Sequence, residues 1–233
     1  MSDYRPANPL QWLLTKAEPW QNAIGRSARR KLMRRYKKRA EADYRRIRAA
    51  LGPGDICLDL GANVSEVTAD LAATGALVHA YEPDPETFAK LQAKVGHLPN
   101  VVLHQAAVGA KPGTVHLRRE RHYATDPTKY SVGSSVVFDD ARMDQTNSVD
   151  VRQVAFADVL AGFDRKVAFI KMDIEGSELA DLADLFARGD FSGFERLYAE
   201  TRQHLRPADM PEILRLRKAA AALHTPDINL YWR

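Results

Sequence analysis

Short apolar segments alternate with amphipathic helical segments from residue 56 onward, and this alternation restricts the fold more than any other feature of the sequence. Strands are predicted at 56–60, 76–84 and 100–109, and helices at 64–75 and 85–96. Because strands that alternate with helices of this length form parallel sheets with right-handed crossovers, the sequence predicts an α/β fold with a doubly wound, mostly parallel sheet.

The second half of the chain repeats this alternation after a polar interruption. The segment 121–148 is rich in turn residues and is predicted to be a loop between strands at 113–120 and 149–156. The remaining elements are predicted as a strand at 166–175, a helix at 176–189, a strand at 194–201, a helix at 207–223 and a short strand at 227–233.

Length and composition favour one sizeable core. The chain has 233 residues, of which 45% are hydrophobic and 27% charged, as in ordinary globular proteins. No apolar run approaches the roughly 20 residues that cross a bilayer, and the first residues lack a signal-peptide pattern, so we expect no transmembrane segment and a cytoplasmic location. Cys57 is the one cysteine, which excludes a disulfide framework, and its apolar strand suggests inert packing.

Positive charge is concentrated near the N-terminus. Residues 26–48 contain 12 lysines and arginines and 2 acidic residues, whereas the net charge of the whole chain is +4. The sequence predicts a basic helical extension over residues 1–51, followed by the main domain over residues 52–233. The apolar residues that could dock this helix are sparse: Ile24, Leu32, Met33, Tyr36, Tyr44, Ile47 and Leu51. Two interpretations stay open, a solvated docked helix and a surface for an anionic partner such as a phosphate, an acidic glycan, a membrane surface or a nucleic acid.

Three successive strand ends carry residues suited to a nucleoside. Gly61 in "DLGAN" lets the backbone approach a ligand, with Asp59 and Asn63 on either side. Glu82 ends the next strand about 20 residues later, where an acid accepts hydrogen bonds from both ribose hydroxyls. The end of "HQAAVG" could line an adenine. Ligands of open parallel sheets bind at such carboxyl ends.

The first turn does not fit a dinucleotide. The fingerprint for a pyrophosphate requires glycines at three positions, and here the corresponding residues are Gly61, Asn63 and Glu66. A glutamate at the start of the helix places negative charge where the pyrophosphate would lie. A ligand with adenosine and no phosphate, such as S-adenosylmethionine, needs no such glycines.

The segments "DLGANVSEVTADLA", "AYEPDPETFAKLQ", "HQAAVG", "SVGSS" and "FIKMDIEGSELADL" together resemble the FkbM-type S-adenosylmethionine-dependent methyltransferases. The resemblance covers roughly residues 53–202, and "KMDIEGSEL" is its most specific element. It implies a Rossmann-like class I methyltransferase fold and methylation of hydroxyl oxygens, often on sugars or related metabolites. This sequence departs from the family at Ser65, which is usually glycine, and in its short C-terminal end.

The resemblance also implies roles for individual residues. Asp59, Gly61 and Asn63 would line the methionine end of the cofactor, and Glu82 would hold the ribose. The adenine would be bordered by Gln105 and Ala106.

A row of charged residues follows the strand near residue 170. Lys171, Asp173 and Glu175 alternate in sequence and would point the same way if the strand persisted. Removal of a proton from an alcohol needs a base within hydrogen-bond reach, and we expect Asp173 to be that base. Glu175 would orient the acceptor or cap the next helix, and Lys171 would keep the carboxylates ionised. The alternative is an ion pair that merely closes the strand end.

Other residues are weaker candidates. Glu200 could reach the same cleft, and His204 follows four residues later, whereas Ser134 and Ser135 could fold over the cofactor or acceptor. The carboxylates of Asp173, Glu175 and Glu200 could instead hold a divalent metal such as magnesium, which is not the favoured interpretation.

The leading hypothesis is a methyltransferase that acts on a hydroxyl of a small-molecule or carbohydrate acceptor. One alternative is a nucleic-acid methyltransferase that uses the basic segment 26–48 as a clamp. Another is a binding module that keeps the fold and has lost catalysis. The sequence carries no motif that identifies the acceptor.

Overall fold

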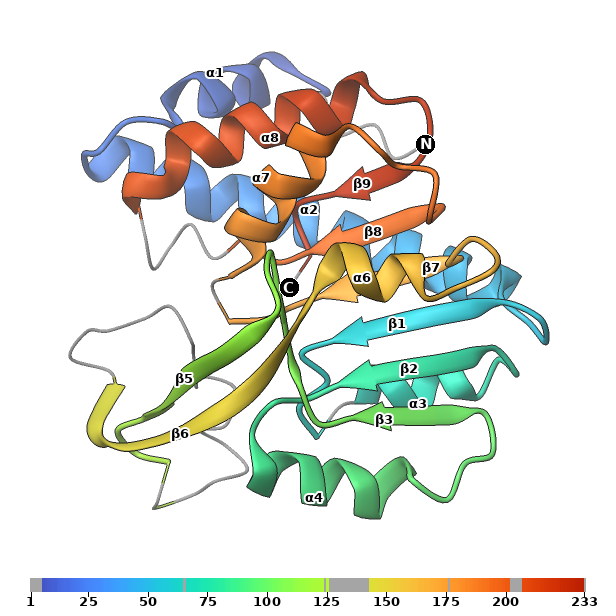
Figure 1. The fold of residues 1–233 in the computed structure, drawn as a ribbon. Coiled ribbons are helices and arrows are strands. Elements are labelled where there is room, and N and C mark those ends of the chain that lie inside the picture. Colours follow the sequence, from blue (N-terminus) through green and yellow to red (C-terminus); the bar gives the residue numbers. More distant parts are fainter. Residues whose placement is uncertain are drawn as a thin grey trace.

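A six-stranded sheet forms the centre of the computed structural model, which describes residues 6–64, 66–123, 125, 143–175, 177–201 and 207–232 (Figure 1). Its strands in spatial order are β3 (Val101–His104), β2 (Leu77–Tyr81), β1 (Ile56–Leu60), β7 (Phe169–Met172), β8 (Arg196–Ala199) and β9 (Asp227–Asn229). All neighbouring pairs among these six strands are parallel. The order reverses between β1 and β7, and ligands of such sheets bind at the carboxyl ends beside this reversal.

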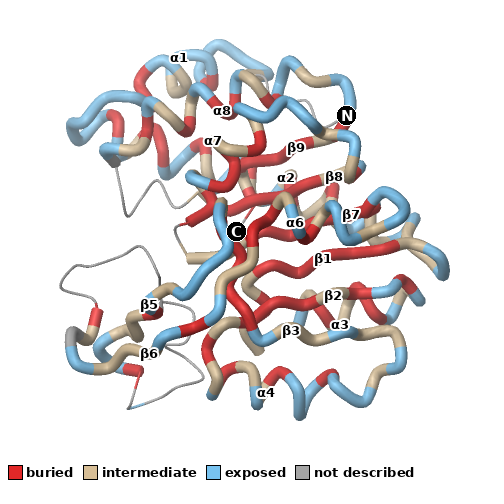
Figure 2. The backbone as a smooth tube through the Cα atoms, in the orientation of Figure 1, coloured by how far each residue is buried: buried red, intermediate tan, exposed pale blue. Residues whose placement is uncertain are grey.

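Helices cover both faces of the sheet, so the molecule is the doubly wound, Rossmann-like α/β fold that the alternation predicts (Figure 1). One face carries α2 (Ala23–Ala50), α3 (Glu66–Ala72) and α4 (Pro85–Val95). The other carries α6 (Phe156–Ala161), α7 (Glu178–Arg188) and α8 (Met210–Ala222), the last preceded by a 3₁₀ turn, η2 (Pro207–Asp209). The central strands β1, β7 and β8 are almost entirely buried between these layers, whereas β3 at the edge of the sheet is partly exposed (Figure 2).

Side chains along β1 point alternately toward the two layers of helices. Ile56, Leu58 and Leu60 belong to the core cluster under α6, α7 and α8, whereas Cys57 packs on the α2 and α3 side. Asp59 shares the direction of Cys57 because successive side chains of a strand point to opposite faces. It is therefore buried beneath α3 and not at the surface.

A second, three-stranded sheet in the described part of the chain has the order β4-β6-β5. Its strands are β4 (Ala107–Gly109), β5 (Gly113–Glu120) and β6 (Met143–Ala155). The antiparallel ribbon of β5 and β6 extends away from the main sheet on the side of the strands' carboxyl ends (Figure 1). The prediction of one strand over 100–109 was wrong, because the amide of Ala106 donates to the carbonyl of His104 at 3.0 Å in a tight turn, and the chain changes sheets there.

The predicted loop 121–148 was also too long. β6 begins at the buried Met143, opposite Glu120, and the sequence from 144 to 148 is polar because this part of the ribbon is partly open to solvent. The short helix α6 follows at once, where the sequence pattern suggested the end of a strand. At the C-terminus the described chain contributes β9, which is parallel to β8, after α8.

Of the N-terminal helices, α2 packs on the main sheet. Helix α1 (Pro9–Ala17) lies against α2, and the second half of α2 joins the core cluster of the sheet through Tyr44 and Ile47. The ring of Tyr44 lies 5.5 Å from that of Phe169 and 5.1 Å from that of Trp232. A division of the chain after residue 51 stays a prediction. Across the described residues, no helix has the length and apolar character needed to cross a membrane.

Candidate active site

The turn after β1 packs directly against the turn after β7. Gly61 has a φ of 76°, and a Cβ built on it would lie 1.8 Å from the carbonyl oxygen of Asp173. Both the backbone conformation and the missing space therefore require glycine here. The sequence pattern assigned this glycine to close approach of a ligand, but contact within the protein already accounts for it.

A buried ion pair joins the two central strands. Asp59 and Lys171 are register partners in β1 and β7, and Lys171 Nζ lies 3.1 Å from Asp59 Oδ1. Asp59 has no exposed surface, and its Oδ2 accepts a hydrogen bond of 2.7 Å from Thr68 Oγ1 of α3. Lys171 Nζ also donates to the carbonyl of Gly61 at 2.6 Å. Together these contacts hold the first turn in place.

Lys171 is fixed in its protonated form. Burial alone would lower the pKa of Lys171, but the carboxylates of Asp59 and Asp173 outweigh burial and raise it. Its ammonium lies 3.9 Å from Asp173 Oδ2, so it presents a positive charge to that half-buried carboxylate. Lys171 is therefore suited to position and charge compensation, and not to accepting a proton.

Glu82 lies at the end of β2 with its carboxylate turned toward the first turn. Its Oε2 accepts from the amide of Asn63 at 2.8 Å, and its Oε1 accepts from the amide of Asp84 at 2.9 Å. Burial raises the pKa of Glu82 to about 7, although these two hydrogen bonds and Lys171 act in the opposite direction. Each carboxylate oxygen keeps a second lone pair, so the group can accept further hydrogen bonds.

Asn63 shapes the same turn. It has a φ of 52°, in the left-handed region that asparagine tolerates better than most residues, and its Oδ1 accepts from the amide of Val64 at 2.6 Å. Its own amide is the donor to Glu82. Ser65, the departure noted in the sequence, lies outside the described residues.

The turn between β3 and β4 borders a cleft at the carboxyl edge of the sheet. Gln105 and Ala106, both predicted to border the adenine, line this cleft of about 530 Å³. Its walls include Tyr81 and His104, whose rings stack with centroids 4.3 Å apart, and Arg152 of β6. The cleft thus offers flat aromatic and polar surfaces close to Glu82, whose amide donates to the carbonyl of His104 at 3.1 Å.

A histidine pair under this cleft was not anticipated from the sequence. His79 Nδ1 lies 3.0 Å from His104 Nε2. Burial, with the charges of His79 and Arg152, lowers the pKa of His104 to about 4, so its ring is neutral at physiological pH. The two residues lie on neighbouring strands, offset from each other by two residues in the register. Nothing in the sequence of either strand alone indicates this contact.

Asp84 anchors the β5–β6 ribbon to the site, and it too was missed. Its carboxylate caps α4 by accepting from the amides of Glu86 and Thr87, and it accepts from Arg119 Nε of β5 at 2.7 Å. The Tyr123 hydroxyl donates to the same carboxylate at 3.1 Å. An aspartate directly before Pro85 is a helix-cap signal that could have indicated the first of these roles.

The second turn departs from the predicted row of charges. Strand β7 ends at Met172, and Glu175 has a φ of 58°, so the alternation of Lys171, Asp173 and Glu175 along one strand face does not persist. Lys171 and Asp173 are brought together, whereas Glu175 lies in the turn. Glu178, the first residue of α7, accepts from the amide of Ile174 in this turn at 2.7 Å, and the N-cap position of α7 is Ser177 and not Glu175.

Glu200 lies next to this turn at the end of β8. It is buried, and its amide donates to the carbonyl of Met172 at 3.0 Å. Among the described residues no group of three His, Cys, Asp or Glu side chains could hold a metal ion. The weaker candidates Ser134, Ser135 and His204 lie outside the described residues. Cys57 is buried in the core, and burial raises the pKa of its thiol to about 12.

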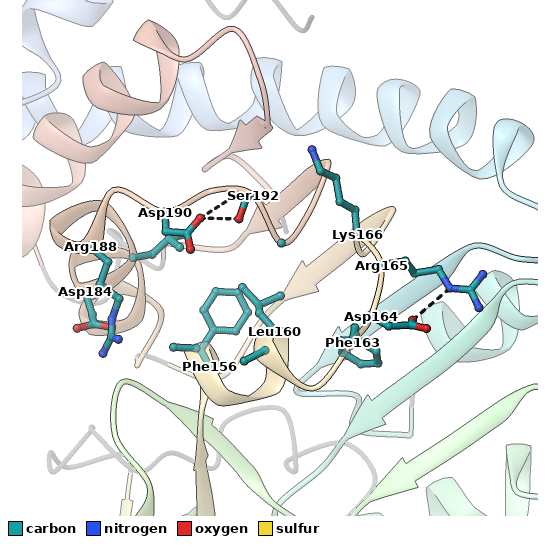
Figure 3. A pocket seen from close by; sticks show the side chains of 14 residues that line it. Phe156, Leu160, Phe163, Asp164, Arg165, Lys166, Asp184, Arg188, Asp190 and Ser192 are labelled. Carbon is teal, nitrogen blue, oxygen red and sulfur yellow. Dashed lines mark hydrogen bonds and ion pairs between the residues drawn. The ribbon is translucent and has the colours of Figure 1, made fainter.

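Another cleft, of about 460 Å³, opens where β7 and β8 begin (Figure 3). Phe156, Leu160 and Phe163 line it, with charged side chains such as Arg165 and Arg188 around them. It lies at the amino edge of the sheet and contains none of the predicted site residues. The carboxyl edge is therefore the candidate site.

Comparisons with known proteins identify the family of the chain. A family model described as the methyltransferase FkbM domain matches residues 59–219, a range that includes both turns and Glu82. No curated protein matches the sequence at a significant level. Among solved structures, the crystal structure of Thermoplasma acidophilum 1320 is similar over 92% of this chain and 78% of that chain, with 14% identity and a TM-score of 0.35.

Proposed function

Because this chain belongs to the methyltransferase FkbM domain family, we propose that it uses S-adenosylmethionine to methylate a hydroxyl group of a sugar or small-metabolite acceptor. The observation that carries this proposal is the meeting of three groups beside the β1–β7 reversal. These are the glycine turn at Gly61, the buried carboxylate of Glu82, and the pair of Lys171 and Asp173.

The residues present fit an adenosine that carries no phosphate. Glu82 can accept hydrogen bonds from both ribose hydroxyls, and Gln105 and Ala106 line the neighbouring cleft. Helix α3 begins with Glu66, whose negative charge at a helix N-terminus disfavours a pyrophosphate. Asp59 is fully buried, so it would act on the methionine end through Lys171 and the turn it supports.

When bound, S-adenosylmethionine supplies an activated methyl group. We assign to Asp173 the removal of the acceptor's hydroxyl proton as the new carbon–oxygen bond forms and the carbon–sulfur bond breaks. Asp173 is half-buried at the strand end, and the ammonium of Lys171 lies 3.9 Å from its carboxylate. Glu175, in the same turn, is placed to orient the acceptor.

The cofactor assignment is tested at Glu82. Glu82→Gln should weaken S-adenosylhomocysteine binding about ten- to hundredfold, because hydrogen bonds to an ionised carboxylate are lost. Titration calorimetry measures this, with Glu86→Gln as the control, since the Glu86 carboxylate contacts Arg119 and is partly exposed.

The pH dependence of binding gives a second test of the same assignment. The pKa of Glu82 in the ligand-free protein is about 7, and binding favours the ionised carboxylate. The affinity of the wild type for S-adenosylhomocysteine should therefore rise as pH increases through about 7. Absence of binding to the wild type would refute the cofactor assignment.

The base is tested separately. Asp173→Asn should leave S-adenosylhomocysteine affinity within about threefold of the wild type and lower turnover about 10²- to 10⁴-fold. Turnover is measured as transfer of a labelled methyl group to a panel of sugars and small alcohols. Glu175→Gln is the matched variant from the same turn and should have the smaller effect. Full turnover in Asp173→Asn would move the role of base to another group.

A further inference from the structure

Large apolar side chains are exposed mainly at one place, the N-terminal helical pair. Seven large hydrophobic residues are exposed among the described residues, and five of them lie between residues 10 and 24. We call these five the N-terminal apolar patch: Leu10 (64% exposed), Trp12 (53%), Leu13 (57%), Trp20 (48%) and Ile24 (60%). Five large apolar side chains exposed within one short segment are a candidate interaction site, whereas scattered single ones are normal on protein surfaces.

Helix α1 differs from an ordinary surface helix because it presents large apolar side chains to solvent. It buries the polar Gln11 and exposes Trp12 and Leu13, which share its outer face with Lys16. Lys16 Nζ lies 5.4 Å from the centre of the Trp12 ring. Helices in water bury their apolar face, so this outer face is suited to a non-aqueous environment.

The structure holds this apolar face outward. The guanidinium of Arg29 is buried and donates to the carbonyls of Glu18 at 2.6 Å and of Trp20 at 3.0 Å, which fixes the turn between α1 and α2. Glu18 in turn pairs with the buried Arg217 of α8 at 2.9 Å. A Cβ at Gly25 would lie 1.9 Å from the carbonyl oxygen of Trp20, so the turn is closely packed. The exposure of the patch is therefore built into the fold.

A basic face continues from the patch along α2. Ile24, the last residue of the patch, lies on the same helical face as Lys31, Arg35 and Lys38, at spacings of 7, 11 and 14 residues. The exposed lysines and arginines of α2 are Arg26, Arg30, Lys31, Arg34, Arg35, Lys38, Arg45 and Arg46. Apolar and aromatic side chains next to lysines and arginines are the composition of helices that lie in the interface of an anionic bilayer.

We propose that the N-terminal apolar patch and the adjoining basic face of α2 dock the protein on an anionic phospholipid surface. Tryptophan is favoured at the boundary between lipid and water, and the basic face complements acidic headgroups. A second copy of the chain is a poorer occupant, because pairing this face with itself would bring two strongly positive helices together. A nucleic acid would engage the basic face but leaves the aliphatic Leu10, Leu13 and Ile24 without a role.

The tryptophans provide a direct test. Of the three in the chain, Trp12 and Trp20 belong to the patch, whereas Trp232 is buried in the core. With vesicles of phosphatidylcholine containing about 30% phosphatidylglycerol, we expect a blue shift of tryptophan emission and quenching by brominated acyl chains. Pure phosphatidylcholine vesicles should give much weaker binding, and added salt should weaken binding to the anionic vesicles.

Two variants separate the apolar and electrostatic contributions. Trp12→Ser with Leu13→Ser should lower vesicle binding about tenfold or more, and Lys31→Glu with Arg35→Glu should lower it similarly. Matched controls are Val102→Ser, which changes an exposed apolar residue of β3, and Lys111→Glu with Lys166→Glu, which changes exposed lysines elsewhere. The controls should bind like the wild type. Thermal melting confirms that each variant is folded, and quenching of the wild type tests insertion without any substitution.

Three results would overturn the proposal. The first is absence of binding to anionic vesicles at about 0.15 M salt. The second is a wild-type dimer in sedimentation that Trp12→Ser with Leu13→Ser abolishes, which would assign the patch to a second copy. The third is tight duplex-DNA binding that the charge variant alone removes, with vesicle binding unaffected by Trp12→Ser and Leu13→Ser.

Discussion

Two acidic side chains near the candidate site are buried without a full counter-charge, and both titrate abnormally. Glu82 has a pKa of about 7, and Asp181 of α7 has a pKa raised to about 8, first by burial and then by the charges of Glu178 and Asp184. Only 1% of Asp181 is exposed, and in the described part of the chain neither of its carboxyl oxygens has a hydrogen-bond partner. Such groups cost stability when ionised.

Asp181→Asn should therefore change how stability depends on pH. The folded pKa of Asp181 lies above the ordinary value of 3.8, so the folded state holds its proton longer, and stability falls as pH rises between about 4 and 8. The variant lacks this cost, so at about pH 9 its free energy of unfolding should exceed that of the wild type by on the order of a few kcal/mol, and it should melt at a higher temperature. At about pH 5 the difference should vanish or reverse.

Thermal denaturation across this range measures the effect, and Asp184→Asn serves as the control. Asp184 lies one turn later on the same helix, is partly exposed and pairs with Arg188 at 2.6 Å. Its substitution removes one of the charges that raise the pKa of Asp181 but leaves the Asp181 carboxyl buried, so it should give a much smaller rise at high pH than Asp181→Asn. If the melting temperature of Asp181→Asn differed from that of the wild type by the same amount at all pH values, the raised pKa of Asp181 would be refuted.

At the scale of elements, the site depends on two strand-end turns that fit against each other. The turn after β1 offers Gly61, the turn after β7 offers the carbonyl of Asp173, and Lys171 links them through the Gly61 carbonyl. Each turn also contains a non-glycine residue at positive φ, Asn63 in one and Glu175 in the other. Residues in such conformations persist where the surrounding structure holds them, and they cluster at functional sites.

Gly61→Ala tests this fit, with Gly54→Ala as its control. Both glycines have positive φ, 76° for Gly61 and 98° for Gly54, but a Cβ at Gly54 would meet nothing within 4 Å. Gly54→Ala should cost about 1 kcal/mol from its backbone conformation alone. Gly61→Ala should cost several kcal/mol, because the carbonyl of Asp173 must move, and denaturant unfolding measures both. Equal losses of stability in the two variants would show that the turns after β1 and β7 are not tightly packed against each other.

At the scale of the whole molecule, both ends of the chain are tied to the same region. The buried Arg217 of α8 pairs with Glu18 at the end of α1, donates to the carbonyl of Leu230 at 3.2 Å, and lies 4.0 Å from the centre of the Tyr231 ring. Tyr36 of α2 contacts the same ring, with centroids 4.4 Å apart. The N-terminal helices are thus held on the main domain by residues far from the candidate site in sequence, so the proposed surface function and the proposed chemistry would use different parts of the molecule.

The sequence by itself determined the architecture and the edge of the sheet at which the candidate residues meet. Strand and helix periods are local properties, so the alternation from residue 56 sufficed to predict a doubly wound parallel sheet. Strand ends of a parallel sheet converge on one edge, so Gly61, Glu82 and Asp173 could be placed together before any contact was known. The motif residues of the FkbM family then pointed to methyl transfer.

Tertiary structure alone decided which of these residues face one another and how they are charged. The pairing of Asp59 with Lys171 follows from the register between β1 and β7, and the capping of Ile174 by Glu178 follows from a strand that ends earlier than its apolar pattern. Contacts between residues far apart in sequence have no local signature, because they depend on register and on the packing of layers. The same holds for the N-terminal apolar patch, since only the buried contacts of Arg29 show which face of α1 is left outside.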